Sequence, residues 1–518
     1  HTGNFPALEL RGLAPLETHE NGGSVWNARL LGCLLTLEIA SLEGRATLAP
    51  NENGVAIELG SAGRHQLRIG LARESRAASL LAERSALPTP DDLANERKIA
   101  WQWRWGSAWA QFPAPHLTAF WARSLFYLLC SYGPDERSPA APTGWAAPGW
   151  DYGFPQDLSF VLPAFLRLGH FDIAKAWCEN YRRELPRFQN YARDVWNAAG
   201  AMTPWHFPIG REVRLGAPGG DWRTLPNDDW AWYEYQIHNA AYPARMAHLT
   251  SRYLRDETWT REVAWPLVVE AARFFASFLE RKNGKWSLWA RPSSGQDEFG
   301  GHNAPNYLDA LFGARYCLSS ALELARELKI HLPEENSWRA VLREGLAFER
   351  LLDANSGILR SCENSDWDFR RQKHPIQLGA LAFLPQGNCP DEAAIRAFER
   401  RHELCIGGEN GIFYGWTLPT LWLSAAHLGN FSALETDLDL APRVGNVDEN
   451  WVQFYESSPA HMPFFVTSHG LALQALSDIF VHDFWGQTTR ANSLPPNWSG
   501  ASFAGFHTRD GQIHEGHF

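Results

Sequence analysis

The sequence predicts a mainly α-helical fold, an (α/α)6 barrel (a six-hairpin toroid) preceded by a small N-terminal β-domain. Apolar residues recur at helical spacing in about a dozen segments between residues 113 and 490. Almost no strand-like segments lie between them. Two connections, residues 165–177 and 424–437, share one form: an apolar helix end, a glycine and a short turn into the next helix. Such repeated hairpins build a closed toroid.

The region before the helices has a different pattern. Residues 1–75 contain short apolar runs, such as 30–40 and 65–72, separated by glycine and asparagine, which predicts a small or truncated β-domain. Residues 76–112 are expected to form a helical linker, and residues 113–490 the barrel. Residues 491–518 are rich in Pro, Gly and Ser and predict a loop-like C-terminal tail.

Composition narrows the classes of protein. The chain has 518 residues, of which 45% are hydrophobic and 20% charged, as in folded globular proteins. The net charge of -11 argues against nucleic acid as a partner. No apolar run reaches the roughly 18 residues of a membrane span, so no membrane partner is expected. The seven cysteines form no CxxC pair, and neither a metal nor a cofactor is expected.

Two further features are compositional. No signal-peptide pattern is visible, and the compartment and oligomeric state stay open. The chain contains 25 tryptophans, whose indole faces stack on the C–H faces of sugar rings. The alternative is that these side chains are large core residues.

The first candidate site is a polar, glycine-rich loop just before a strong helix. It carries Asp297, Glu298, His302 and Asn303. A loop this polar between apolar helices is costly to hold unless it faces solvent or a ligand. The alternative is an ordinary helix start capped by Asn303 or Asn306.

The second candidate is Glu456, which lies among the aromatic residues Trp451, Phe454 and Tyr455. Removing a carboxylate from water raises its pKa, so these neighbours are expected to desolvate Glu456. The alternative is a partly exposed loop glutamate.

The third candidate precedes a helix and combines Trp150 and Asp151 with Gln156 and Asp157. An aromatic platform beside a carboxylate suits recognition of sugar hydroxyls, whereas capping by Asp157 is the alternative. Other candidates for the same pocket, each of which could instead be core packing, are Trp205, His206, Glu234, Gln236, His238, Lys373, His374, Gln377, Trp416 and Tyr455.

These segments, in this order, resemble glycoside hydrolase family 65, which includes kojibiose and maltose phosphorylases, acid trehalases and glucosidases acting on glucosylgalactosyl-hydroxylysine. GQDEFGGHNAPNY, from residue 295, is similar to the family's GPDEYH stretch and the NNAYTN that follows it. GAMTPW, from residue 200, resembles its GA..PW motif, and KHPIQLGALAFLP, from residue 373, falls where the family has KQADVVLL. The departures, DEF for DEY and KHPI for KQAD, mark a divergent relative.

The resemblance implies roles for individual residues. Glu298 matches the general acid of the family, and Glu456 the general base of its hydrolytic members. Asp157 matches the aspartate of the glucose-binding Trp-Asp pair, with Trp150 and Asp151 as the alternative. Lys373 and Gln377 match the residues that line the pocket.

The implied reaction is inverting hydrolysis of an α-glucosidic bond in a small saccharide or glycoconjugate. The presence of Glu456 favours a hydrolase over a phosphorylase, although Lys373 could serve a phosphate. An epimerase or lyase on the same toroid, or a sugar-binding protein without catalysis, are further alternatives.

Overall fold

The computed structural model describes two compact units, His1–Trp101 and Gln102–Phe518. The described residues are 90–134, 152–205, 207–208, 235–296, 303–363, 365, 372, 374–409 and 413–518, together with the backbone of six strands between residues 8 and 73.

The first unit contains two antiparallel three-stranded sheets, with strand orders β2–β3–β6 and β1–β5–β4. The strands are β1 (Leu8–Arg11), β2 (Val25–Leu30), β3 (Cys33–Ser41), β4 (Ala46–Asn51), β5 (Gly54–Leu59) and β6 (His65–Arg73). These small sheets agree with the β-domain that the sequence predicts. Helix α2 (Pro90–Trp105) follows them in the chain.

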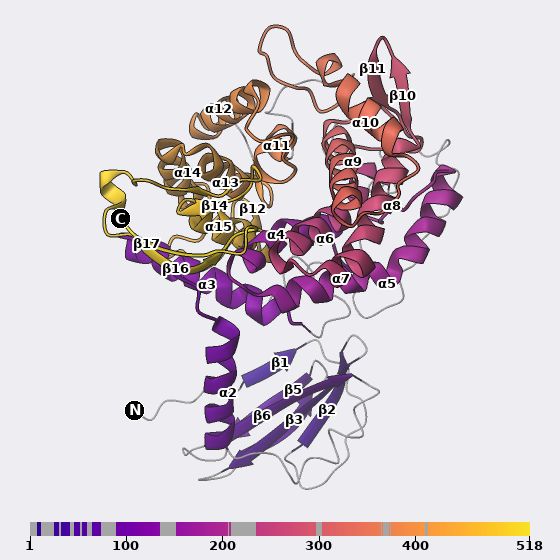
Figure 1. Cartoon of the computed structure of the whole chain (residues 1–518). Coiled ribbons are helices and arrows are strands. Elements are labelled where there is room, and N and C mark those ends of the chain that lie inside the picture. Colours follow the sequence, from indigo (N-terminus) through magenta and orange to yellow (C-terminus); the bar gives the residue numbers. More distant parts are fainter. Residues whose placement is uncertain are drawn as a thin grey trace. The chain divides into compact units, whose positions relative to one another are not determined.

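The second unit is an (α/α)6 barrel, as predicted. Six inner helices pack each on the next, and the last packs on the first, so the ring closes. They are α4 (Pro155–Arg167), α6 (Ala241–Leu254), α9 (Leu308–Glu327), α11 (Gly379–Ala382), α13 (Thr417–Leu428) and α15 (Val466–Asp478). The outer helices that alternate with them are α3 (Pro115–Ser131), α5 (Phe171–Trp196), α8 (Trp265–Ala276), α10 (Glu335–Glu344), α12 (Glu392–Ile406) and α14 (Phe431–Arg443). Figure 1 shows the hairpins following one another around the ring.

Burial explains the two layers. Every residue of α15 is buried, and in α13 every residue except Leu428 is buried. The outer helix α10 buries only Trp338 and Val341. A helix that is covered on all sides belongs inside the ring, whereas a helix with one apolar stripe belongs outside it.

The connection between α13 and α14 shows how a hairpin turns. Gly429 ends α13 with a φ of 66°, a left-handed conformation that glycine adopts without strain. The Asn430 side chain then accepts a hydrogen bond from Ala433 N and caps α14. The repeated connector in the sequence therefore marks a real hairpin.

The C-terminal tail differs from the predicted loop. It contains β16 (Ser502–His507) and β17 (Ile513–His517), and β16 also pairs with β7 (Trp109–Gln111). The physical reason is burial, because Phe503 stacks on Phe480, which directly follows α15, at 4.8 Å. This contact between distant segments is not visible in the local Pro/Gly-rich composition.

Two predicted helices end earlier than expected. The helix expected to reach residue 282 stops at Ala276 and is followed by the hairpin β10 (Leu279–Lys282) and β11 (Lys285–Leu288). Its turn is Asn283-Gly284, both with positive φ, a strong hairpin signal that the helical periodicity concealed. Likewise, Gly345, with a φ of 90°, ends α10 inside the segment 337–352.

Short two-stranded sheets also lie in the connections. They pair β8 (Tyr152–Gly153) with β9 (Phe207–Pro208), β12 (Tyr455–Ser457) with β13 (His461–Pro463), and β14 (Val481–His482) with β15 (Thr489–Arg490). None of the described helices combines the length and apolarity needed to cross a bilayer. The described residues also contain no cluster of three potential metal ligands.

Candidate active site

Most of the described candidate residues lie at one end of the barrel, which we call the mouth: the N-terminal ends of the six inner helices. Gln156 and Asp157 are in the first turn of α4. His238 lies in the 3-10 turn Ile237–Ala240 before α6, and Gln377 in the 3-10 turn Ile376–Leu378 before α11. Trp416 directly precedes α13. Successive inner helices run in the same direction, so these segments converge.

A buried polar chain joins three inner helices at the mouth. His238 Nδ1 lies 2.9 Å from Asp309 Oδ2, and His238 Nε2 lies 3.4 Å from Gln156 Oε1. Asp309, in the first turn of α9, also accepts a hydrogen bond of 2.7 Å from Gln296 N. Since all four residues are buried, the chain fixes α4, α6 and α9 relative to one another.

Hydrogen bonds hold both ends of the segment that carries Glu298. On one side Gln296 N is bonded to Asp309. On the other, Asn303 N donates to Ser293 O at 2.8 Å, and Asn303 Oδ1 accepts from Ser293 N at 3.0 Å. The alternative that Asn303 or Asn306 caps the helix is wrong, because the N-cap of α9 is Tyr307. The segment between Gln296 and Asn303 therefore starts and ends close to the mouth.

An aromatic wall connects the predicted residues His374 and Trp416. Their rings stack with centroids 4.3 Å apart and an interplanar angle of 12°. Trp416 also contacts Phe160 of α4 edge-on at 5.2 Å. Phe160 in turn contacts Tyr242 of α6 at 5.5 Å, and Tyr242 packs on His238. The wall therefore reaches the buried polar chain.

Glu456 lies on β12 beside this wall. Its backbone carbonyl accepts a hydrogen bond from Gly415 N, the residue before Trp416. A side chain at Gly415 would meet the Phe465 ring at 3.4 Å, and its φ of 38° also favours glycine. The contact distance is an ordinary one, so the backbone conformation is what favours glycine here. Tyr455 points to the opposite side of the strand from Glu456, because side chains alternate.

The expected desolvation of Glu456 by its aromatic neighbours is wrong. The Glu456 side chain is partly exposed. Trp451 and Phe454 instead turn into the core, where both pack against Phe120 of α3. These core contacts join segments that are distant in the chain, so local sequence does not reveal them.

His469 of α15 supports the chain just before Glu456. Its Nε2 accepts a hydrogen bond of 3.1 Å from Phe454 N, and its Nδ1 lies 2.9 Å from Ser124 Oγ. An imidazole that accepts at Nε2 carries its proton on Nδ1 and is neutral. Burial agrees with this, because it lowers the pKa of His469 to about 3.

The remaining described candidates also lie around the mouth. Asp157 Oδ1 accepts a hydrogen bond of 2.6 Å from Thr467 Oγ1 and so ties α4 to α15. Trp205 packs edge-on against Phe154, which precedes α4. Gln236 forms a parallel bridge with Ser294, close to the segment of Glu298.

Gln377 is a buried polar candidate residue whose side chain lacks hydrogen-bond partners. Its side chain is 2% exposed, and neither its Nε2 nor its Oε1 has a hydrogen-bond partner among the described residues. A buried amide without partners loses free energy unless water or a ligand supplies them. Gln377 therefore fits a residue that binds hydroxyl groups.

Several candidates cannot be placed. The residues that lie outside the described part of the chain are Trp150, Asp151, His206, Glu234, Asp297, Glu298, His302 and Lys373. In contrast, Asp309 and Thr467 occupy the mouth but were not predicted from the sequence. Asp309 had a usable signal, since its carboxylate stands among apolar residues in the first turn of α9, directly after the polar loop.

Comparisons with known proteins bear on the fold. No protein-family model matches the chain, and no curated protein matches it in sequence. A candidate kojibiose phosphorylase from the human microbiome matches with a TM-score of 0.67 and 12% identity, covering 97% of this chain and 71% of that chain. A bacterial glucoamylase complexed with acarbose matches with a TM-score of 0.55 and 11% identity, covering 88% and 73%. The chain shares its six-hairpin (α/α)6 toroid with these two proteins.

Proposed function

We propose that the chain is a glycoside hydrolase that cleaves an α-glucosidic bond in a small saccharide or glycoconjugate by an inverting acid/base mechanism. The observation that carries this proposal is the arrangement of the mouth. Glu456 is tied through Gly415 to the start of α13, and Gln296, at one end of the segment with Glu298, is tied to Asp309 at the start of α9. Asn303, at the other end, is bonded to Ser293 of the same connection. The shared fold and the sequence motifs around these residues support the assignment.

The two carboxyl groups have opposite tasks in this mechanism. Glu298 gives a proton to the glycosidic oxygen that leaves, and Glu456 takes a proton from the water that attacks the opposite face of the sugar. In inverting enzymes the two groups stand roughly 6.5–9.5 Å apart, which leaves space for that water. The partial exposure of Glu456 suits a base, because it keeps the carboxylate in contact with water.

The surrounding residues suit recognition of a sugar. The stacked pair of His374 and Trp416 offers a flat, apolar wall, and the buried amide of Gln377 offers one acceptor and two donors. Asp157, in the first turn of α4, is a carboxylate at the same end of the barrel and is bonded to Thr467 of α15. In this proposal hydroxyl groups of the substrate pair with Gln377 and Asp157 while its C–H face rests on the wall.

The test is a pair of isosteric substitutions, Glu298→Gln and Glu456→Gln. Each is expected to lower kcat by roughly 10²- to 10⁴-fold, because acid/base catalysis contributes about that much, while sugar binding persists. Glu449→Gln, at an exposed position of the same connection as Glu456, is the matched control and should keep full activity. Near-normal rates in both variants would contradict the proposal.

The same assay separates the alternatives. A panel of disaccharides is incubated with and without inorganic phosphate, and NMR identifies the released anomer. A hydrolase releases free sugar without phosphate, and inversion gives the β-anomer first from an α-glucoside. A sugar phosphate would indicate a phosphorylase, an unsaturated product absorbing in the ultraviolet a lyase, and binding without product a non-catalytic protein.

A further inference from the structure

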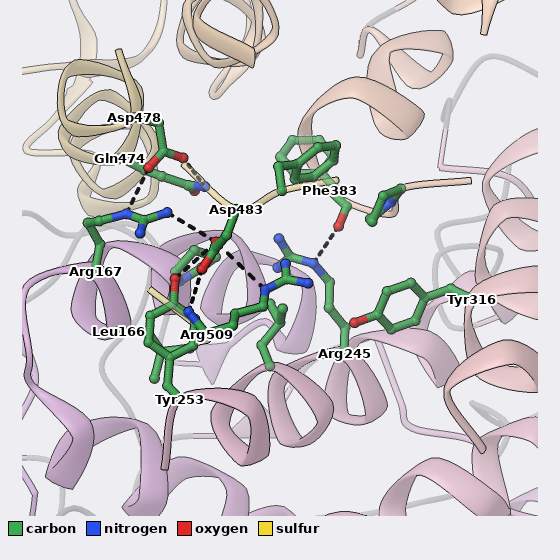
Figure 2. A pocket seen from close by; sticks show the side chains of 14 residues that line it. Leu166, Arg167, Arg245, Tyr253, Tyr316, Phe383, Gln474, Asp478, Asp483 and Arg509 are labelled. Carbon is green, nitrogen blue, oxygen red and sulfur yellow. Dashed lines mark hydrogen bonds and ion pairs between the residues drawn. The ribbon is translucent and has the colours of Figure 1, made fainter. Parts of the chain in front are cut away.

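A cavity lies at the end of the barrel opposite the mouth, which we call the floor. Its interior offers about 20 Å³ to the centre of a water-sized sphere, which is room for one small group. The lining comes from the last turns of inner helices, with Leu166 and Arg167 of α4, Tyr253 of α6, and Gln474 and Asp478 of α15. Arg509, in the loop between β16 and β17, closes one side (Figure 2). None of the described candidate residues of the mouth lines this cavity.

The charged side chains of the lining do not balance. Three arginines, Arg167, Arg245 and Arg509, face two aspartates, Asp478 and Asp483. The excess is therefore one positive charge. A charge buried in a protein is normally paired, because an unpaired one loses its hydration without compensation.

Arg167 engages both carboxylates. Its Nε donates to Asp478 Oδ1 at 3.0 Å and its Nη2 to Asp483 Oδ1 at 3.1 Å. Gln474 and His427 also contact Asp478 Oδ2, both at 3.0 Å. These carboxylates are thus already surrounded by donors and leave little acceptor capacity for the other two arginines.

Arg245 has no acidic partner in the described part of the chain. Its side chain is buried, and it donates only to Phe383 O and to Ser159. Its Nη2 has no hydrogen-bond partner among the described residues. Burial, to which Arg509 adds repulsion, lowers the pKa of Arg245 to about 10. The cation is therefore held in an environment that disfavours its charge.

Arg509 is the second cation, and its ion pair with Asp483 is a loose one. Its Nε is buried without a hydrogen-bond partner and lies 3.7 Å from Asp483 Oδ1, too far for a good hydrogen bond. Figure 2 shows its guanidinium group beside that of Arg245, and the two repel each other. Two like charges converge on a cavity where, among the described lining residues, the buried acceptor without a hydrogen-bond partner is the neutral Gln474 Oε1.

We propose that the floor cavity is a binding site for a small monovalent inorganic anion of the chloride class, held between the guanidinium groups of Arg245 and Arg509. One such anion cancels the excess positive charge. It also accepts hydrogen bonds from N–H groups of Arg245 and Arg509 that have no other acceptor. Guanidinium groups are weakly hydrated and form strong charge-assisted hydrogen bonds to anions, so they suit a buried site.

The apolar part of the wall selects against larger or more hydrated anions. Leu166, Leu249 and Phe383 also line the cavity, and their side chains offer no hydrogen bonds to an anion. A divalent anion would lose more hydration on entry and would overcompensate the single excess charge. The bound anion would also fasten the β16–β17 loop to α6, since it joins Arg509 to Arg245.

The site is tested with halide salts on the whole protein. Thermal unfolding is followed while sodium chloride replaces sodium gluconate at constant ionic strength. A ligand that binds only the folded state raises Tm, and we expect a saturating rise of roughly 2 °C or more in the wild type. Crystals soaked in sodium bromide should show an anomalous peak between Arg245 and Arg509.

Two variants and one control make the test specific. Arg509→Gln, on a surface loop, should fold and lose both the chloride-dependent rise and the bromide peak. Arg245→Gln should do the same, and Arg193→Gln, at an exposed arginine of α5, should keep both. An equal chloride response in wild type and Arg509→Gln, a rise that does not saturate, or a wild-type crystal without the peak would overturn the proposal. These measurements do not depend on catalytic activity.

Discussion

At the residue scale, three buried histidines make the fold sensitive to acid. Burial lowers the pKa of His469 and His482 to about 3 and that of His170 to about 4. In the unfolded chain these groups regain a pKa near 6.5. Below that pH the unfolded state therefore binds protons that the folded state does not bind. The free energy of unfolding consequently falls as the pH drops.

His469→Gln tests this at the residue that supports Phe454. Each such histidine should make the free energy of unfolding fall by about 1.4 kcal/mol per pH unit between its folded and unfolded pKa. The variant removes one of these protonation sites. Its free energy of unfolding should therefore fall less steeply between pH 6 and 4, by about that amount per pH unit. Urea denaturation across this range measures it. His331→Gln, at an exposed position, should leave the slope unchanged; an unchanged slope in His469→Gln would contradict the argument.

At the scale of elements, Asp309 connects the start of α9 to two neighbouring segments. One carboxylate oxygen meets both His238 Nδ1 and Gln296 N, and the other accepts from Ala310 N at 2.8 Å. Because Gln296 begins the segment that carries Glu298, Asp309 acts as a positioning residue in the proposed mechanism. A misplacement of about 1 Å in a catalytic group is enough to cost about 10²-fold in rate.

Asp309→Ala is therefore expected to lower kcat by roughly 10²-fold while the helical circular dichroism spectrum is retained. Asp309→Asn keeps an oxygen that can accept from Gln296 N and should lose less activity than the alanine variant. Steady-state kinetics with a cleaved disaccharide measures both. If the alanine variant is as active as the wild type, the tie between Asp309 and Gln296 does not position the catalytic segment.

At the scale of the whole barrel, Arg167 joins the first and last inner helices. It pairs with Asp478 of α15 and with Asp483 after β14, and its Nη1 donates to His507 O of β16. Burial alone would raise the pKa of Asp478, but Arg167 and His427 outweigh it and lower that pKa to about 2. Electrostatic contacts, as well as apolar ones, thus hold α4 and α15 together where the ring closes.

Asp478→Asn is expected to lower the free energy of unfolding by roughly 3 kcal/mol at neutral pH, because it leaves a buried arginine short of a counter-charge. The ionised form of Asp478 stabilises the fold above its unfolded pKa near 4, and this contribution disappears as the pH falls toward 2. Urea denaturation at pH 7 and pH 3 measures both effects. Asp439→Asn, at an exposed position, is the control, and equal stability of the two variants would contradict the prediction.

Much of the architecture followed from local patterns. Helical periodicity predicted most of the inner and outer helices, because a helix that buries one face has apolar residues at a regular spacing. The glycine turns predicted that these helices pair into hairpins. The same patterns placed Gln156, His238 and Trp416 at helix starts, whereas the short helix α11 after Gln377 was not predicted. In a toroid of hairpins, such starts meet at one end.

Contacts between distant segments decided the rest. The contact of Phe503 with Phe480 stabilises a strand where the sequence predicts a loop-like tail. Trp451 and Phe454 pack into the core, and Glu456 is partly exposed. The sequence by itself determined a closed ring of hairpins and the segments that form its mouth. Only the tertiary structure decided which polar groups pair. It left the Gln377 amide without a hydrogen-bond partner and Arg245 without an acidic one among the described residues, because hydrogen bonding depends on distances that no local pattern encodes.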